Sequence, residues 1–415
     1  MRKIFFVLLI ILVLINFSGC FIDLEEPQEP QEPQKIIYYI STAEELYNLR
    51  YINNRHYKQI ADIDLSEYEN WIPIGDKKPF SGSYDGNGFK ITNLKINTKE
   101  LDNVGLFSEV TRFSKISNVT LENVDIKGNN YVGGIVGRNL GEISNSKVSG
   151  IISGKNFVGG ITGYNYRIIT ECYAEILIEA YNYIGGLTGE NRGIVENNNS
   201  NGKIRGNDYV GGLIGLNTGT VENSISNGEV HGNIYVGGLI GNTRKNILKN
   251  NFSDVKVIGR DNIGGLIGYS SSRIENSYAL GNVIGRNYIG GLIGYIEKNS
   301  VVNSYSENNV TGTSNLGGFV GYNNYGIIKN CYSVGEVKSN FVTSSKGGFL
   351  GINLEEIGII EKSYYNLEKS EISDKYAEGK STIEMKKKET FIGWDFENIW
   401  DIDEGKSYPF LRSEN

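Results

Sequence analysis

A pair of adjacent glycines returns about every 26 residues through two thirds of this chain, and it constrains the fold more than any other feature. The pair lies in segments such as VGGIVG at Val132–Gly137 and KGGFLG at Lys346–Gly351. The first glycines of the pairs are residues 133, 159, 185, 211, 237, 264, 290, 317 and 347. A fixed period of 20–50 residues is typical of solenoids, propellers and other stacked arrays. Such an array offers a long surface rather than a single pocket.

A second motif repeats in step with the glycine pair and begins closer to the N-terminus. Each copy is an aliphatic residue that is usually followed two positions later by Asn. Eleven copies start at Ile91, Ile116, Ile143, Ile169, Val195, Val221, Leu248, Ile274, Val301, Ile328 and Ile360. Glu171 and Lys362 replace the Asn in two of them. We expect about eleven coils, and we expect this Asn column to form an internal ladder of hydrogen-bonded side-chain amides.

Within one unit, apolar and polar residues alternate, which is the period of a strand rather than of a helix. The segment Gly219–Asn233 (GTVENSISNGEVHGN) shows this alternation and its breaks at Gly and Asn. Three short strands and three turns fit into one unit, whereas a propeller blade needs four strands and about 40 residues. We therefore predict an all-β fold, a parallel β-helix or a closely related β-solenoid, with coils about 4.8 Å apart. Gly marks the coil corners, where the backbone bends tightly or approaches another segment closely.

Cys172 and Cys331 both stand at the small-residue position directly after the Asn column. They are six coils apart, which is about 29 Å at the spacing of strands in a sheet. A disulfide needs Cα atoms within about 7 Å. We expect both cysteines to be buried replacements for Ser.

The N-terminus has the pattern of an export signal. Arg2 and Lys3 precede the apolar run Ile4–Ile15, which is too short for a typical transmembrane helix and has the length of a signal-peptide core. The ending Phe17-Ser18-Gly19-Cys20 resembles the bacterial lipoprotein signal, in which cleavage precedes a lipid-modified Cys. The resemblance implies lipidation of Cys20 and attachment to a bacterial membrane; plain secretion and an uncleaved anchor stay open as alternatives. The Glu-Pro-Gln repeat that follows is an extended tether, or else a tail without a spacing role.

Two sequence segments predict caps on the ends of the solenoid. Ser41 and Glu44 form a capping box that opens a helix running to about Ile52, and Ser381 and Glu384 form another. Solenoids need atypical terminal units to cover their ends. The resulting boundaries are a signal peptide at 1–19, lipidated Cys and tether at 20–35, an N-terminal cap at 36–78, the β-helix at 79–365 and a C-terminal cap at 366–415.

Several segments in a fixed order resemble bacterial surface proteins with GLUG repeats. They are STAEELYNL, IADIDL at Ile60–Leu65, WIPIG at Trp71–Gly75, FSGSYDGNGFKITNL at Phe80–Leu94, VGLF at Val104–Phe107, the GGLIG repeats and GWDFENIWDIDEGKSYPFL at Gly393–Leu411. SYDGNG with the following IxN also looks like the opening coil of pectin-lyase-like β-helices, which implies a right-handed coil. The GLUG resemblance implies an exported, surface-exposed protein, and for some of its members a role in adhesion.

The sequence shows little that points to catalysis. His56 and His231 lie in different units, and neither a His-Glu-x-x-His segment nor a calcium-binding GGxGxD repeat is present. The acid pairs Asp62/Asp64 and Asp401/Asp403 lie in the caps, where turn and cap hydrogen bonds account for them. We expect a non-enzymatic protein without cofactor or metal, and we keep a polysaccharide-active β-helix enzyme and a passive spacer as alternatives. The formal net charge of −7 and the scattered basic residues argue against nucleic-acid binding.

One aromatic position recurs two residues before the glycine pair. It is occupied by Tyr131, Phe157, Tyr183, Tyr209, Tyr235 and Tyr288, with Asn262 and Asn315 as gaps. Stacked in register, these side chains would form a stripe along the rod. The stripe is either cross-strand packing that shields glycine or a binding face for a glycan or a surface protein, since aromatic rings suit both. Apart from its lipid contact with the membrane, we expect the chain to be a monomer.

The lipoprotein signal gives a direct test. Cys20→Ser removes the only acceptor for the lipid in that signal, so the protein should move from the membrane fraction to the soluble fraction. Fractionation of cells that express either form measures this. A Cys20→Ser protein that still partitions with membranes to the same extent would contradict lipidation at this residue.

Overall fold

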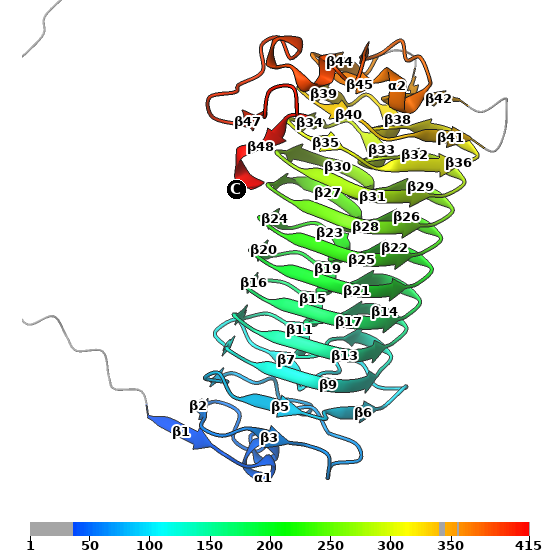
Figure 1. Ribbon diagram of the computed structural model, residues 1–415. Helices are drawn as coiled ribbons and strands as arrows, with labels where there is room; N and C mark the ends of the chain where they lie inside the picture. Colours follow the sequence, from blue (N-terminus) through cyan, green and yellow to red (C-terminus); the bar gives the residue numbers. More distant parts are fainter. Residues whose placement is uncertain (1–35, 340–344, 355–356, 415) are drawn as a thin grey trace, which may run out of the picture. The chain divides into compact units, whose positions relative to one another are not determined.

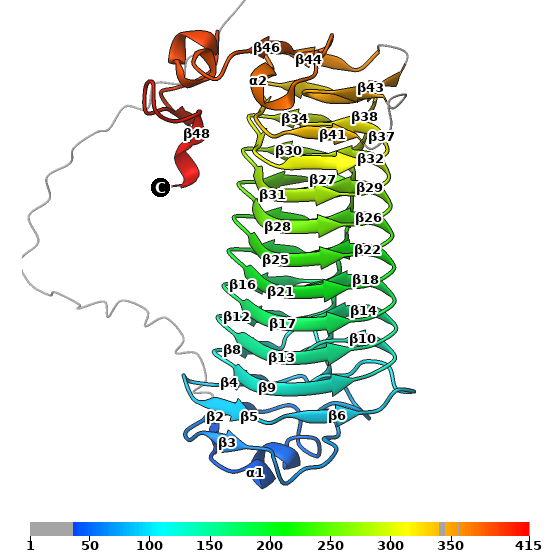
Figure 2. The same cartoon turned by 45° about the vertical axis from the view of Figure 1, so that its right-hand side comes forward.

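The computed structural model describes residues 36–339, 345–354 and 357–414. Cys20, the predicted signal peptide and the tether lie outside the described residues. The fold below is that of the unit Ile37–Asn415. It is the predicted parallel β-solenoid, with about eleven turns (Figures 1 and 2).

One wall of the solenoid, sheet C, contains nine parallel strands, each of which ends at or directly before the glycine pair. They are β10 (Asn130–Val132), β14 (Asn156–Gly159), β18 (Asn182–Gly185), β22 (Asp208–Gly211), β26 (Ile234–Gly237), β29 (Asp261–Gly264), β32 (Asn287–Gly290), β37 (Ser314–Gly317) and β42 (Lys346–Gly347).

The second wall, sheet A, has 21 strands in two columns. The column after the glycine pair contains β7 (Phe107–Val110), β11 (Val136–Asn139), β15 (Thr162–Asn165), β19 (Thr188–Asn191), β23 (Ile214–Asn217), β33 (Ile293–Glu297), β38 (Val320–Asn324) and β43 (Leu350–Asn353). The column that leads to the Asn motif contains β1 (Ile37–Ile40), β2 (His56–Gln59), β4 (Ser83–Asp85), β8 (Lys115–Ser117), β12 (Glu142–Ser144), β16 (Ile168–Thr170), β20 (Ile194–Glu196), β24 (Thr220–Glu222), β34 (Ser300–Val302), β39 (Ile327–Lys329) and β44 (Ile359–Glu361). The strands β27 (Ile240–Lys249) and β30 (Ile267–Glu275) run through both columns.

The third wall, sheet B, has 16 strands and follows the Asn motif. They are β3 (Ile63–Asp64), β5 (Lys90–Thr92), β6 (Lys95–Asn97), β9 (Thr120–Lys127), β13 (Lys147–Ser153), β17 (Tyr173–Glu179), β21 (Asn199–Arg205), β25 (Ile225–His231), β28 (Phe252–Ile258), β31 (Tyr278–Ile284), β35 (Tyr305–Ser306), β36 (Asn309–Gly312), β40 (Tyr332–Ser333), β41 (Val337–Ser339), β45 (Tyr364–Asn366) and β46 (Glu378–Lys380). A separate antiparallel pair joins β47 (Trp400–Asp401) to β48 (Phe410–Leu411).

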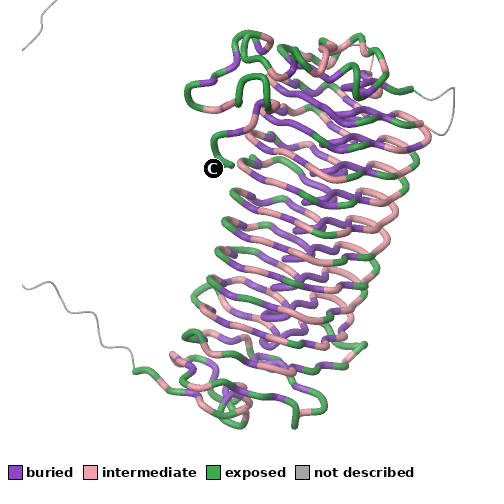
Figure 3. The backbone as a smooth tube through the Cα atoms, in the orientation of Figure 1, coloured by how far each residue is buried: buried purple, intermediate pink, exposed green. Residues whose placement is uncertain are grey.

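The repeat of the sequence becomes the register of the sheets. Val210 in β22 pairs with Val236 in β26, and Ser226 in β25 pairs with Ser253 in β28. Identical positions therefore stack directly above one another, and columns of apolar side chains are buried in the interior of the coil. Figure 3 shows buried positions recurring from coil to coil. Cys172 and Cys331 are buried and unpaired, as predicted. Burial raises the pKa of the Cys172 thiol to about 12, so it stays protonated.

The glycine pair lies where the chain turns from sheet C into sheet A. A Cβ on Gly212 would lie 2.0 Å from the carbonyl oxygen of Gly238 in the next coil and 2.0 Å from Ser226 Oγ. A Cβ on Gly215 would lie 2.4 Å from the backbone nitrogen of Ile184 in the preceding coil. Glycine is needed here for close backbone approach, as predicted, and not for a left-handed backbone. The left-handed conformation occurs instead at the aromatic residue before the pair and at the Asn motif.

The Asn column forms the predicted hydrogen bonds, but its predicted position inside the coil is wrong. The amide of Asn145 donates to Asn118 Oδ1 at 2.7 Å, and Asn250 donates to Asn223 at 3.0 Å. These side chains lie at a half-buried to exposed corner, because their left-handed backbone turns them outward. The buried amide ladder belongs to another column, at the ends of β11, β15, β19 and β23. Its members are Asn139, Asn165, Asn191 and Asn217, which are 0% exposed and are joined by bonds of 2.7–2.8 Å.

Both caps are present, with corrections to their local structure. Helix α1 (Ala43–Asn48) is capped by Thr42 and Glu45, one residue later than predicted, and it ends before Ile52. The hydroxyl of Thr42 accepts from the backbone of Glu45, and Ser41 instead donates to the Glu45 carboxylate. At the other end, α2 (Leu367–Ser370) is one turn long, and the Ser381–Glu384 box opens a 3₁₀ turn (Glu384–Lys386) rather than an α-helix. Further 3₁₀ turns cover Lys388–Thr390 and Arg412–Glu414.

The close approach at the glycine pair predicts a large cost for any side chain there. Gly212→Val should destabilise the protein by about 1–3 kcal/mol, since the new side chain meets backbone that cannot move without disturbing the next coil. Glu222→Gln, a half-buried change in the same coil, should cost under about 0.5 kcal/mol. Thermal unfolding of both variants measures the difference. Equal melting temperatures for wild type and Gly212→Val would contradict this geometry.

Candidate binding stripe

The aromatic residues before the glycine pair lie in the strands of sheet C but outside its ladder. Asn182 pairs with Asp208 and Ile184 pairs with Val210, which leaves Tyr183 and Tyr209 between the paired positions. Both hold a left-handed backbone, with φ of 57° and 59°. This conformation turns each side chain away from the core, so the rings are half-buried on the outside of the coil.

The rings of consecutive coils stack on one another. Ring centroids are 4.8 Å apart for Tyr131–Phe157, 4.6 Å for Phe157–Tyr183 and 4.6 Å for Tyr183–Tyr209, with interplanar angles of 9°, 6° and 18°. Tyr235 continues the column at 4.9 Å with a tilt of 34°. The structure therefore brings five of the six predicted stripe residues into one continuous stack. Tyr288 is separated from the others by the coil that carries Asn262.

A second column of tyrosines continues the stripe where the first is interrupted. Tyr269, Tyr295 and Tyr322 lie in β30, β33 and β38, and their centroids are 5.2 and 4.8 Å apart. Tyr235 meets Tyr269 edge-on at 5.7 Å, and Tyr288 meets Tyr322 edge-on at 5.2 Å. The sequence analysis did not predict this column. Each of its members is a Tyr that directly follows the last Gly of a repeat, as in Gly268-Tyr269. We call the two columns together the aromatic stripe: Tyr131, Phe157, Tyr183, Tyr209, Tyr235, Tyr288, Tyr269, Tyr295 and Tyr322.

Charged residues border the stripe at its end toward the N-terminal cap. The Arg138 guanidinium lies 5.7 Å from the ring centroid of Tyr131 and donates to Glu109 at 3.0 Å. Arg192 lies 5.5 Å from the ring of Tyr164, which occupies the same position as Tyr269 further along the rod. Its guanidinium donates to Glu190 at 2.6 Å, and this carboxylate raises the pKa of Arg192. Each of these two arginines therefore has its charge balanced by a carboxylate of the same chain.

A different aromatic ladder, on sheet B, is covered by the C-terminal segment. Tyr278, Tyr305 and Tyr332 stack at 4.7 and 4.9 Å. Trp394, Trp400 and other apolar residues of the C-terminal segment pack on this ladder and form a small core separate from the main one. The Tyr305 hydroxyl donates to Glu414 at 3.0 Å, and burial raises the pKa of Tyr305 so that it keeps its proton. The C-terminal cap therefore covers a flank of the last coils, where a cover for the open end alone was expected.

The acid pairs of the caps are engaged in structural bonds. Asp64 accepts from Asn93 at 2.8 Å and from the backbone of Ser66, and these bonds lower the pKa of its carboxyl, opposite to the shift that a general acid needs. Asp401 pairs with Arg412 at 2.9 Å, and Asp403 accepts from Lys406 at 3.2 Å. Across the described residues, no three His, Cys, Asp or Glu side chains gather as metal ligands would.

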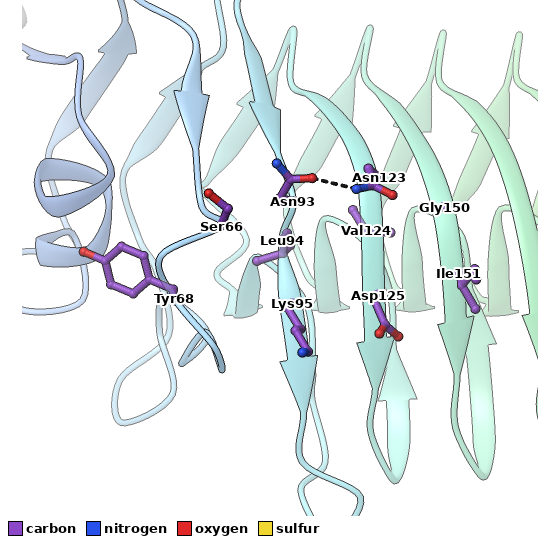
Figure 4. A pocket seen from close by; sticks show the side chains of 10 residues that line it. All are labelled: Ser66, Tyr68, Asn93, Leu94, Lys95, Asn123, Val124, Asp125, Gly150 and Ile151. Atoms are coloured by element: carbon purple, nitrogen blue, oxygen red, sulfur yellow. Dashed lines mark hydrogen bonds between the residues drawn. The ribbon is translucent and has the colours of Figure 1, made fainter.

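A groove lies beside the N-terminal cap, where Asn93 and Asn123 have a left-handed backbone (Figure 4). It has a volume of about 470 Å³ and is lined by Ser66, Tyr68, Asn93, Leu94, Lys95, Asn123, Val124, Asp125, Gly150 and Ile151. Asn123 donates to Asn93 at 2.6 Å, and Asp125 pairs with Lys127 at 3.7 Å. The ring of Tyr68 points away from the strands in Figure 4. The groove thus lacks an aromatic platform, and the side chains of Asn93, Asn123 and Asp125 already have polar partners.

Comparison with known proteins identifies the repeat. The family described as "The GLUG motif" matches residues 128–153, 259–284 and 312–338, so the chain carries GLUG repeats. "Halomucin" of Haloquadratum walsbyi is 35% identical over 112 residues, which is 24% of this chain and 1% of that protein. A "Putative Gly-rich membrane protein" of Evansella cellulosilytica is 34% identical over 122 residues, which is 27% of this chain and 14% of that protein. The chain thus spans a small part of the curated relatives that it matches.

Among solved structures, a "putative immunoglobulin A1 protease from Bacteroides ovatus" matches over 91% of this chain and 93% of its own, with 17% identity and a TM-score of 0.33. A TM-score this low supports no transfer of fold or of peptidase activity. Within the part of the chain that the structure describes, no helix has the length and apolarity of a membrane span.

The separate core under the C-terminal segment predicts a local response to mutation. Trp400 is 0% exposed, and Trp400→Ala should cost about 3–5 kcal/mol. Because this core is distinct from the main one, the loss should open residues 391–411 and leave β25 protected in hydrogen exchange. Ile392→Ala, at a side chain that is 74% exposed, is the control and should change neither region. Loss of protection throughout the rod would contradict a separate core.

Proposed function

We propose that this chain is a non-enzymatic surface protein, attached to a bacterial membrane by lipid at Cys20, that binds a partner through its aromatic stripe. The observation that carries the proposal is the left-handed backbone of the stripe residues. Tyr131, Phe157, Tyr183, Tyr209, Tyr235 and Tyr288 have φ values of 56–59°. A bulky residue in this conformation is an outlier, and such outliers cluster at functional sites, which supports the proposal.

The energetics favour an outward role for these rings over a packing role. A left-handed backbone costs about 1–2 kcal/mol for most residues and less for Asn. Each stacked ring pair returns about 0.5–1.5 kcal/mol, which roughly offsets that cost. Asn262 and Asn315 occupy the same position and the same conformation in two coils, so the fold does not require a ring there. Stability alone gives little reason to keep aromatic residues in the other coils.

The geometry also limits how a partner can bind. Interplanar angles of 6–18° mean that the ring faces are occupied by the neighbouring rings. The stripe therefore presents ring edges and a row of phenol hydroxyls rather than open ring faces. A sugar that stacks on ring faces fits such a row poorly, while a protein surface or a polymer that contacts edges and hydroxyls fits well. A surface protein is accordingly the favoured partner class, with a glycan as the alternative.

Export and attachment are supported by the N-terminal sequence, where the charged residues, the apolar run and Cys20 follow in the order of a lipoprotein signal. The match to a protein named as a membrane protein agrees with a place at the cell surface. On this proposal, the Glu-Pro-Gln tether joins the lipid to the N-terminal cap, and the rod carries the stripe away from the membrane.

Asn substitutions separate binding from packing, because Asn already occurs at this position in two coils. The triple variant Tyr183→Asn, Tyr209→Asn and Tyr235→Asn should unfold within about 2 kcal/mol of wild type, since released strain offsets lost stacking. Its binding to hits from a glycan and surface-protein array should fall by about tenfold or more, as expected when several contacts are lost together.

The matched control carries Asn at Tyr39, Tyr51 and Tyr181, which are 60%, 72% and 56% exposed and lie outside the stripe. It should bind like wild type. A stripe variant that is stable and binds every array hit normally would contradict the proposal and would leave the rod as a spacer. A stripe variant that unfolds would show that the rings serve packing.

A further inference from the structure

We infer that the partner of the aromatic stripe is the stripe of a second copy of this chain, so that two rods lie side by side. The inference rests on the proposed function, since it names the partner of the same surface. It is carried by the spacing of the rings and by the row of hydroxyls at their outward edges.

The spacing of the rings selects the partner. Stripe rings repeat at 4.6–4.9 Å, so a partner that touches each ring in the same way must have the same repeat. In an extended peptide, side chains on one face recur at about 6.6–6.8 Å, so the two rows are out of step after one or two rings. Stacked parallel strands repeat at about 4.8 Å. A second β-solenoid therefore matches the row over its whole length, and a copy of this chain also supplies a matching row.

The chemistry of the row allows it to meet a copy of itself. The ring faces within each row are occupied by neighbouring rings, so two rows meet through their ring edges and hydroxyls. Phenol hydroxyls both donate and accept hydrogen bonds, so two rows of tyrosine can bond to each other. Arg138 and Arg192 are paired with Glu109 and Glu190, which reduces the like-charge repulsion between two copies lying parallel. Arg244, near Tyr209 and Tyr269, donates to the neutral side chain of Asn242 and keeps its charge.

The size of the stripe sets the strength of the pairing. From Tyr131 to Tyr322 it crosses eight coils, or roughly 40 Å at the strand spacing. With a width of about 10 Å, it offers about 400 Å² per rod, half of the roughly 800 Å² per partner in a stable complex. Isolated copies should therefore stay monomeric, in line with the sequence expectation. Copies held in one membrane gain a high effective concentration, and pairing becomes favourable there.

The test is oxidative tyrosine cross-linking of the full-length lipidated protein in phosphatidylcholine vesicles at sparse and dense loading. Dense loading should give covalent dimers, joined mainly through Tyr183, Tyr209 and Tyr235, at about ten times the sparse yield or more. The stripe triple Asn variant should lose most of these dimers. The control with Asn at Tyr39, Tyr51 and Tyr181 should keep them, although its substituted tyrosines are more exposed.

Three results would overturn the inference. The first is a dimer yield that does not rise with loading, and the second is a set of cross-links that map to Tyr51 or Tyr181. The third is an equal dimer yield from wild type and from the stripe variant. The array experiment distinguishes failure of the pairing inference from failure of the proposed binding function. If the rods do not pair but the stripe variant loses an array partner, the stripe is a binding surface and its partner is not a second copy of this chain. If the stripe variant behaves like wild type in both assays, both proposals fall.

Discussion

Backbone packs directly on backbone where each coil turns from sheet C into sheet A. Gly212 leaves room for the carbonyl of Gly238 in the next coil, and Gly215 leaves room for the backbone of Ile184 in the preceding one. Any side chain at these points would push neighbouring coils apart and break the ladder of parallel strands. Because the approach recurs in each coil that carries the glycine pair, identical positions stay in register along the rod. The residue two positions before the pair has a left-handed backbone, which points its side chain outward.

The same register produces two aromatic ladders that the molecule uses differently. The ladder of Tyr278, Tyr305 and Tyr332 on sheet B is covered by Trp394, Trp400 and their neighbours, so its rings belong to a core. The stripe on the other side has no such cover from the described residues, and its rings stay half-exposed. A covered ladder stabilises the end of the rod. An uncovered one, kept despite an unfavourable backbone conformation, is the part of this surface best suited to a partner.

The period alone was sufficient to predict the solenoid, its coil count and the steric role of the glycine pair, because a repeat forces equal neighbours to stack. It also placed the stripe rings in one column. It did not reveal their left-handed backbone, since aromatic residues rarely adopt it. The column of Tyr269, Tyr295 and Tyr322 was missed because its first half holds Arg138, Glu190 and Leu216, which hide the pattern. The caps lie outside the repeat, so its period could not predict their details. Tertiary contacts determine that the capping box begins at Thr42 rather than Ser41. They also determine that the C-terminal segment packs back on sheet B.

Tyrosine footprinting by mass spectrometry, on the full-length lipidated protein in vesicles at sparse and dense loading, addresses the central claim most directly. The account predicts that Tyr183, Tyr209 and Tyr235 are modified at sparse loading, while Tyr84 and Tyr332, which are 0% exposed, are protected. At dense loading the stripe should become protected, and Tyr51 should stay reactive. Stripe tyrosines that are as protected as Tyr84 at sparse loading would contradict the account, because the rings would then belong to the core of the rod.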